Sequence, residues 1–494
     1  MVVELTKTDQ PERFTRITTS ISALPDNVLL EIFYFYLDVD QWLRFINPKG
    51  HEDLWHLLVH VCRRWRYIVS ASPRRLNLRL LCTEARPVTR NIWPELPISI
   101  SAQIPKSGRL RSQGVNNVVA ALKQHHNRIC QITIWDTPNS LLNELAAVKP
   151  FSALIHLALW RTDESAPVLP DSFLEGSGPR LQSLFFQSIP FPALGKLLLS
   201  THHLSDLFLD KIPRSGYISP DVLVTSLSEL TRLKHFSLVF QSPRSRADRE
   251  SRVTPSLTRV VLPALASFRF KGDSEYLEDM LSRMDTPLHL RVSITLFHQL
   301  VFDTPLLHNL VKHAGTFKAF PRAVISFASR DIRIVLFQKQ GPAESDVLEL
   351  RISCRPSDWQ LSSLTHLIAS SIPPVYALER LGLRESHQPP PWQEDIEDAQ
   401  WLEMLRPFSS VKDLVLSGQL AQLVAPILGV LIGETVAEAL PALETIFVEG
   451  FLPPASLPSP WQKAIERFIA ARRISGRPVS VHYLGCQANA FVYP

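Results

Sequence analysis

The stretch LQSLFFQSIPFPALGKLLLSTHHLSDLFL, residues 181–209, contains the pattern on which the fold depends. It opens with LQSLFF at 181–186 and closes with LSDLFL at 204–209, and in each copy an apolar residue is followed three and five positions later by two more. Side chains alternate along a β-strand, so the last two apolar positions of a copy share one face. Each unit therefore predicts a short strand followed by a turn or a helix.

The same pattern recurs along most of the chain from residue 129 onward. Further copies are ICQITI (129–134), LIHLAL (154–159), LKHFSL (233–238), LASFRF (265–270), VLELRI (347–352), LERLGL (378–383), VKDLVL (411–416) and LETIFV (443–448). One such unit cannot bury its apolar face alone, so neighbouring units must stack into a curved solenoid. Between 288 and 340 the chain alternates like strands without this signature, and the register there is open. Several compact α/β domains are the alternative.

Residues that flank the last two apolar positions point away from the core, onto the concave strand-lined face. This position holds an aromatic residue in four successive units and a basic residue further along. We predict that a target protein binds Trp135, Trp160, Phe185, Phe208, Arg269, Lys271, Arg351 and Arg384. Strands lie about 4.8 Å apart, so the aromatics should form one patch of the kind enriched at binding hot spots. The basic set suits an acidic or phosphorylated segment of the target.

A second interpretation of Trp135 and Trp160 stays open, in which the N-terminal part of the chain or a loop packs over them as intramolecular core. That part has a helical pattern. In LPDNVLLEIFYFY, residues 24–36, Pro25 suits a first helical position and Asp26 favours the positive end of the helix dipole. The helix has an apolar stripe wider than one core contact needs, made of Leu29, Ile32, Phe33 and Tyr36 and widened by Leu30 and Phe35.

From residue 53 the chain reads DLWHLLVHVCRRWRYIVSASP, which predicts one long amphipathic helix that ends before Pro73. The two patterns together, I-x-x-L-P-x-x-V-L-L-E-I-F and then V-C-R-R-W-R-x-I-V with S-P-R, resemble an F-box. The continuation SPRRLNLRLLC, with WPELPISI at 93–100, resembles a large fungal group of F-box proteins with leucine-rich-repeat-like C-terminal regions. The connection from Asp38 to Glu52 is longer than is usual in that family.

In the F-box family this small helical module docks on a Skp-type adaptor, which connects it to a cullin scaffold. The resemblance implies that the adaptor contacts Leu24, Pro25, Leu29, Ile32, Phe33, Val61, Cys62, Trp65 and Ile68. It also implies that catalysis belongs to other subunits of the complex. We therefore expect a substrate-recognition subunit of a Skp-cullin-F-box ubiquitin ligase. The alternatives are an F-box scaffold that does not promote ubiquitination, and an enzyme or nucleic-acid binder on a solenoid.

Composition and charge limit the classes of partner and the cellular compartment that we expect. A formal net charge of +5 over 494 residues gives no argument for a nucleic-acid or membrane partner. Five isolated cysteines without a C-x-x-C pair predict neither disulfides nor a zinc site, and the first residues lack the apolar core of a signal peptide. We expect a cytoplasmic or nuclear protein.

The uncharged run from Leu414 to Gly433 is long enough to span a bilayer, but its spacing favours a buried soluble helix. That face comprises Leu420, Leu423, Val424, Ile427, Leu428 and Leu431.

Sequence motifs for catalysis are missing from the chain. It has no phosphate-binding G-x-x-x-x-G-K-[ST], no dinucleotide G-x-G-x-x-G and no nucleophile-elbow G-x-S-x-G motif. The adjacent histidines at 125–126 and 202–203 lack a suitably spaced nucleophile or carboxylate cluster, and His56 with His60 lacks a third metal ligand. We expect no enzymatic activity, no metal and no cofactor.

These observations predict an α/β chain in four parts. A tail at 1–20 precedes an all-α F-box at 21–76, a linker at 77–114 and an irregular leucine-rich-repeat-like solenoid at 115–494. Residues 242–252 and 385–398 are expected to be solvated surface loops.

Overall fold

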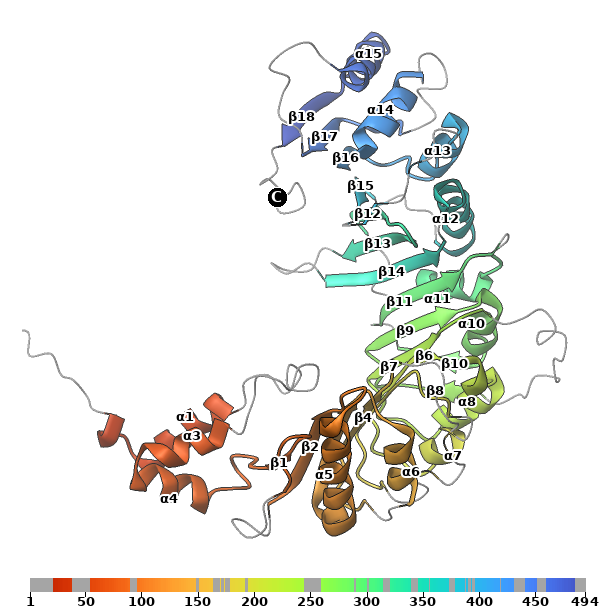
Figure 1. Cartoon of the computed structure of the whole chain (residues 1–494). Coiled ribbons are helices and arrows are strands. Elements are labelled where there is room, and N and C mark those ends of the chain that lie inside the picture. Colours follow the sequence, from red (N-terminus) through yellow and green to blue (C-terminus); the bar gives the residue numbers. More distant parts are fainter. Residues whose placement is uncertain are drawn as a thin grey trace, which may run out of the picture.

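The computed structural model shows a curved array of strands and helices with a small helical module at its N-terminal end (Figure 1). Strands line the inside of the curve and helices cover the outside. The structure describes residues 21–37, 54–88, 96–147, 151–162, 169, 173, 178–191, 194–243, 259–287, 290–299, 302–313, 320–338, 345–354, 356–372, 378–386, 388–389, 392, 396–417, 419–430, 440–450 and 459–484.

The N-terminal module consists of α1 (Asp26–Leu37), α3 (Leu54–Val61) and α4 (Arg63–Ala71), preceded by a short 3-10 turn, Ile21–Ala23. The predicted first helix is confirmed, and it begins at Asp26, one residue after Pro25. The prediction of one long second helix is wrong, because extended backbone at Cys62 separates α3 from α4. The Cys62 thiol caps α4 by accepting a hydrogen bond from the backbone N–H of Trp65 at 3.5 Å.

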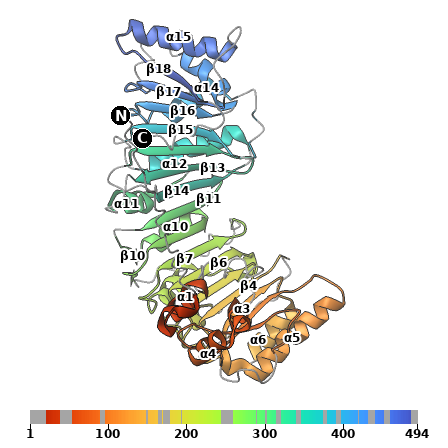
Figure 2. The ribbon, with the colours of Figure 1, turned by 90° about the vertical axis from the view of Figure 1, so that its left-hand side faces the viewer.

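The module has a core of its own, formed by Leu29, Leu30, Phe33, Leu37, Trp55, Leu58, Ile68, Val69, Leu76, Leu78 and Leu96. Arg64 fastens α4 to the start of α1, since its guanidinium donates to the Asp26 carboxylate and to the Leu24 carbonyl. Figure 1 shows the module standing away from the sheet, and in Figure 2, which faces the concave side, it lies in front of the strands.

Parallel strands form the sheet on both sides of one irregular region. Those before it are β1 (Leu80–Cys82), β2 (Ile98–Gln103), β3 (Ile129–Trp135), β4 (His156–Trp160), β5 (Ser183–Gln187), β6 (Asp206–Ile212), β7 (His235–Phe240), β9 (Ser267–Gly272) and β11 (Arg291–Phe297). Those after it are β15 (Arg380–Glu385), β16 (Asp413–Ser417), β17 (Thr445–Glu449) and β18 (Ser480–Leu484). Counted over the described residues, the sheet has 16 strands. All ten copies of the repeat pattern fall on strands, as predicted.

In most copies the first apolar residue closes a tight turn just before its strand. Its backbone N–H donates to the carbonyl three residues earlier in Leu154 to Phe151, Leu181 to Gly178, Leu204 to Thr201, Leu233 to Leu230 and Leu265 to Leu262. The residue that follows donates across to the preceding unit, as Gln182 does to Ile155 at 2.8 Å. The pattern therefore specifies both a buried turn and the first backbone hydrogen bond between neighbouring strands.

The irregular region is an antiparallel block of β12 (Arg322–Phe327), β13 (Ile332–Gln338) and β14 (Ser345–Ser353). The strand order there is β11, β14, β13, β12, β15, so the chain crosses the block before it turns back. Residues 328–331 make the connection from β12 to β13, short enough for a hairpin, with Ala328 donating to the Asp331 carbonyl. Strands predicted between 288 and 340 are thus confirmed, and their open register resolves into one reversed segment.

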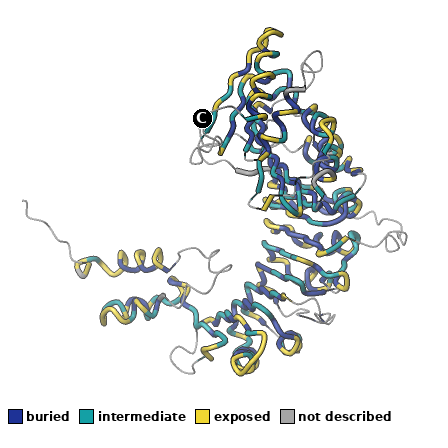
Figure 3. The backbone as a smooth tube through the Cα atoms, turned by 45° about the horizontal axis from the view of Figure 1, so that its top comes forward, coloured by how far each residue is buried: buried dark blue, intermediate teal, exposed yellow. Residues whose placement is uncertain are grey.

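Helices pack against the convex side of the sheet and enclose the main core between the two layers. They are α5 (Arg109–His125), α6 (Asn139–Ala147), α7 (Leu194–Leu198), α8 (Pro220–Leu227), α10 (Ser274–Leu281), α11 (Pro305–His313), α12 (Ser357–Ser371), α13 (Asp398–Leu405), α14 (Gln419–Val430) and α15 (Pro460–Ile474). Short 3-10 turns lie at His126–Arg128 and Arg214–Gly216, and a two-stranded pair is made by β8 (Val260–Val261) and β10 (Met284–Asp285). In Figure 3 the buried residues form a continuous band along the curve. This continuous core fits one solenoid rather than several compact domains.

The structure corrects the expected linker. The segment 77–114, predicted as a linker, contains β1 and β2, which belong to the sheet. The run from Leu414 divides between β16 and α14, where Leu420, Val424, Ile427 and Leu428 are buried and Leu423 is half-buried. Leu431 lies outside the described residues. Among the described helices, none is long and apolar enough to cross a membrane.

The segment 385–398 is not simply a solvated loop. Its Trp392 ring lies 5.3 Å from the ring of Phe327 and 6.2 Å from that of Trp401, so it packs against the main core. The indole Nε1 of Trp392 donates to the Glu385 carboxylate at 2.7 Å. For the other predicted loop, residues 244–252 lie outside the described part of the chain.

Candidate functional site

The concave face carries three rows of side chains that cross the sheet, because parallel strands in register place equivalent positions side by side. One row includes Thr133, Ala158, Phe185, Phe208 and Ser237, each paired with the next. Trp160 lies two residues further along its strand and pairs with Gln187. The four predicted aromatic positions therefore occupy two adjacent rows.

The aromatic ladder, defined as Trp135, Trp160, Phe185 and Phe208, is continuous across β3 to β6. The centroids of Trp135 and Trp160 are 4.8 Å apart with their planes 11° from parallel. Trp160 lies 4.7 Å from Phe185, and Phe185 lies 5.9 Å from Phe208. All four side chains are half-buried. The predicted contiguous patch exists, and its role in target binding stays a prediction.

A polar row crosses the same strands nearer their starts, at Gln131, His156, Ser183, Asp206 and His235. The Asp206 carboxylate contacts the His235 ring at 2.6 Å. Burial alone would raise the pKa of Asp206, but hydrogen bonds from His235 and Ser205 hold that pKa below its usual value. Burial, together with the positive charge of Arg79, lowers the pKa of His156 to about 4. His156 is therefore neutral at physiological pH.

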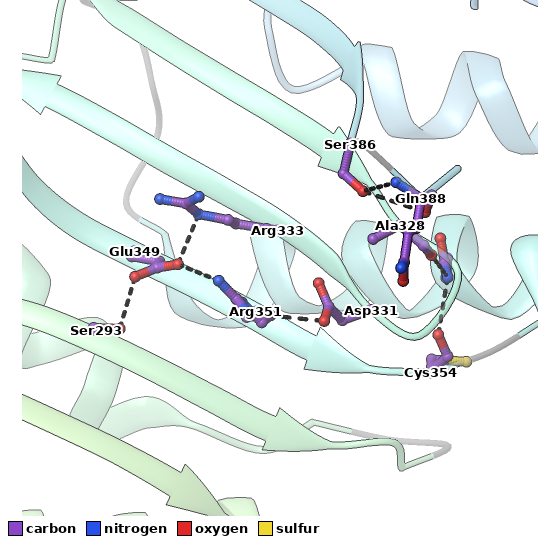
Figure 4. Close-up of polar contacts among 10 residues, drawn as sticks. Ser293, Ala328, Asp331, Arg333, Glu349, Arg351, Cys354, Ser386 and Gln388 are labelled. Atoms are coloured by element: carbon purple, nitrogen blue, oxygen red, sulfur yellow. Dashed lines mark hydrogen bonds and ion pairs between the residues drawn. The ribbon is translucent and has the colours of Figure 1, made fainter. Parts of the chain in front are cut away.

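The centre of the concave face is a network of ion pairs on the reversed block (Figure 4). Glu349 accepts a hydrogen bond from the Ser293 hydroxyl at 2.8 Å and contacts Arg333 at 2.6 Å and Arg351 at 2.9 Å. Arg351 also lies 3.8 Å from Asp331. Burial raises the pKa of Glu349, yet the Ser293 hydrogen bond and the two arginines outweigh it and lower that pKa.

The predicted basic set lies on this face, but carboxylates neutralise much of its charge. Arg384 contacts Glu449 at 2.9 Å, and Arg269 lies 3.7 Å from Asp210. The Lys271 ammonium sits 5.5 Å from the centroid of the Phe297 ring, and burial lowers its pKa. The sequence prediction considered the cations without their cross-strand partners, so the expected basic stretch is a network of mixed charge instead.

A second apolar patch lies on the concave face near the C-terminal end. Val415 is fully buried there, with Val324, Phe447 and Leu484 packed around it, apart from the main core. The Phe447 ring stacks on His482 at 5.5 Å. Sequence reasoning did not single out this patch, although Val415 and Phe447 occupy the same position in the repeat as Phe185.

Sequence reasoning also missed a polar pocket of about 400 Å³ at the carboxyl ends of β3 and β4. Asp136 and Arg161 line it, and they directly follow the two tryptophans of the aromatic ladder. The residue after each ladder tryptophan is polar or charged, which was the signal available in the sequence.

In the helical module, the nine predicted adaptor residues divide between the core and the surface. Leu29, Phe33 and Ile68 are buried in the module core and cannot form a contact surface. Leu24 and Trp65 are half-buried, while Pro25, Ile32, Val61 and Cys62 are exposed. Of the predicted stripe, α1 buries Leu29 and Phe33 and exposes Ile32 and Tyr36. Leu30 and Leu37 complete the buried face, which α3 and α4 both cover.

The opposite side of α1 exposes an apolar outer stripe, defined as Val28, Ile32, Phe35 and Tyr36. These positions are spaced by four, three and one residues, so they lie on one helical face. Leu57 and Val61 of α3 are 59% exposed, and Tyr67 of α4 is 70% exposed. A small module with so many exposed apolar side chains fits a docking element.

Among the described residues, no group of three or more His, Cys, Asp or Glu side chains could hold a metal ion. His56 instead stacks on Trp55, with ring centroids 3.8 Å apart.

Comparisons with known proteins assign no family to this chain. No protein-family model matches the chain. No curated protein matches it either. A solved structure of a leucine-rich-repeat protein from Leptospira interrogans is similar over 79% of this chain and 71% of its own, with 11% identity and a TM-score of 0.25. The description as a leucine-rich-repeat-like solenoid follows from the strands and helices of this chain.

Proposed function

We propose that this protein is a substrate-recognition subunit of a Skp-cullin-F-box ubiquitin ligase. Its helical module would bind a Skp-type adaptor and, through it, a cullin scaffold, while the concave face of the solenoid holds a target protein. The observation that carries the proposal is the presence of two separate surfaces with separate cores. One is the apolar outer stripe of α1, and the other is the aromatic ladder.

The exposed side of α1 supports adaptor docking in a specific way. Ile32 is 41% exposed and Phe35 is 70% exposed, so both can be changed without opening the module core. The F-box resemblance at residues 21–73 supplies the partner class. The buried residues Leu29 and Phe33 then support the helix from behind rather than touching the adaptor.

A pull-down with a purified Skp-type adaptor tests the first half of the proposal. Changing Ile32→Glu and Phe35→Glu together should abolish adaptor capture, because two charges would enter an apolar interface. The matched control is Ile474→Glu, an isoleucine 88% exposed at the far end of the solenoid, which should capture normally. Circular dichroism confirms that both variants fold. Capture by the double variant at wild-type strength refutes the docking surface.

Ubiquitin transfer tests the second half. Proteins captured by the solenoid should be ubiquitinated when adaptor, cullin and the remaining subunits are supplied. If the adaptor binds and a captured protein is never modified, the chain is a scaffold instead.

A further inference from the structure

The pocket beside the aromatic ladder is positively charged. Lys106, Arg111 and Arg161 line it, against one carboxylate from Asp136. Arg161 is only 3% exposed, and its guanidinium donates to the side-chain oxygen of Asn139. The Asp136 carboxylate already accepts a hydrogen bond from the Thr162 hydroxyl at 2.7 Å.

Two of the three cations keep their charge available. Over the described part of the chain, neither Lys106 nor Arg111 forms an ion pair, although the Arg111 guanidinium donates to the Lys106 carbonyl. Asn139 and Ser140 begin α6 and bring the positive end of its helix dipole to the same pocket. The pocket thus combines cations, an amide and a hydroxyl, which suits an anionic group.

The aromatic ladder limits what can lie next to that anion. Trp160 lies between Trp135 and Phe185, so both its ring faces are covered and mainly its ring edge is left for a ligand. A nucleobase or a sugar needs an open ring face for stacking. Ring edges carry partial positive charge and suit aliphatic side chains, carbonyl oxygens and carboxylates. These are the groups of a peptide.

We propose that this part of the concave face binds an extended acidic peptide of the target, which rests on the proposed function of that face. Its apolar residues cover the aromatic ladder, and an Asp or Glu side chain enters the pocket. The ladder crosses three strand intervals of about 4.8 Å, or about 14 Å, which about four extended residues can span. The positive charges of Lys106 and Arg111 attract the acidic residue of the peptide to the pocket.

A display selection with random twelve-residue peptides on the full-length protein tests the proposal. We expect enriched sequences to carry an acidic residue within about four positions of an apolar run. The key variant is Ser140→Glu, which adds a carboxylate at the exposed pocket rim, where a negative charge also favours the start of α6. Ser140→Gln is its matched control. Ser140→Glu should weaken the best synthetic peptide at least tenfold, and Ser140→Gln less than twofold.

Lys106→Glu should weaken the same peptide at least tenfold, and a peptide with Gln in place of the acidic residue should bind as weakly. Several outcomes would overturn the proposal: no enriched peptide, enriched peptides without an acidic residue, equal binding by Ser140→Glu and Ser140→Gln, or a requirement for a phosphate or a free C-terminal carboxylate. Adaptor capture is measured on the same variants. Normal capture with failed peptide binding refutes only this inference, whereas failed capture by the wild type refutes the proposed function.

Discussion

His156 should make the N-terminal half of the solenoid less stable in mild acid. Its imidazole pKa is lowered from 6.5 to about 4, first by burial and then by the positive charge of Arg79, with Asp206 acting in the opposite direction. Because the folded state resists protonation, the unfolded state binds more protons between these two pKa values. The free energy of unfolding contributed by neutral His156 is therefore fully present above pH 6.5 and falls as the pH drops toward 4.

The magnitude follows from the two pKa values. At pH 5, an imidazole with a pKa of about 6.5 when unfolded and about 4 when folded lowers the stability by about 2 kcal/mol. Water reaches the half-buried ring, so we expect about 1 to 2 kcal/mol in practice. Asp206 stays ionised through this range, because hydrogen bonds from His235 and Ser205 hold its pKa below its usual value.

The assay is urea unfolding followed by tryptophan fluorescence, since Trp135 and Trp160 lie on the same strands as this polar row. Wild type, His156→Gln and the control His202→Gln are compared at pH 7.5 and pH 5.0. His202 is exposed in the turn before β6. We expect His156→Gln to lose about 1 to 2 kcal/mol less than wild type on acidification, and His202→Gln to behave as wild type. Equal losses for all three proteins, or an NMR titration of His156 near pH 6.5, would refute the reasoning.

Three further predictions concern the rest of the chain. Val424→Ala should destabilise the C-terminal units by about 1 to 3 kcal/mol, seen as faster hydrogen exchange in α14, because Val424 is fully buried; unchanged exchange would show that the face is not packed. Glu278→Ala should cost about 1 kcal/mol in α11, since its carboxylate accepts hydrogen bonds from the first backbone N–H groups of that helix; exchange confined to α10 would contradict this. The exchange Arg384→Glu with Glu449→Arg should recover most of the stability lost by Arg384→Glu alone, as measured in a double-mutant cycle, while target capture stays lost if the position of the cation matters.

The sequence was sufficient for the strands that carry the repeat signature, because a buried turn residue and two inward residues leave a readable spacing. It was not sufficient for the reversed block. Alternating residues such as those of β12 and β13 fit parallel and antiparallel pairing equally well. The break at Cys62 was also missed, since neither proline nor glycine marks it and a thiol is an uncommon helix cap.

The candidate site could be predicted where it depends on one strand position and not where it depends on distant partners. The aromatic ladder follows from the repeat alone. The charge of Arg384 is neutralised by Glu449, which lies 65 residues away and in a different unit. Lys106 lies in a loop and Arg161 at a strand end of a separate unit. No local sequence spacing therefore predicts that the two residues line one pocket.

The reversed block should change the order in which the units unfold under force. In an ordinary stacked array each unit touches only its sequence neighbours, so a chain pulled from both ends can peel away one unit at a time. Here β11 adjoins β14, while β12 adjoins β15, so residues 291–385 are interlocked out of sequence order. To release the block, both the β11–β14 and the β12–β15 pairing must break, and each joins strands that are not neighbours in the sequence. We expect a single-molecule force trace to show a series of small extensions at both ends and one large simultaneous rupture of about 95 residues in the middle.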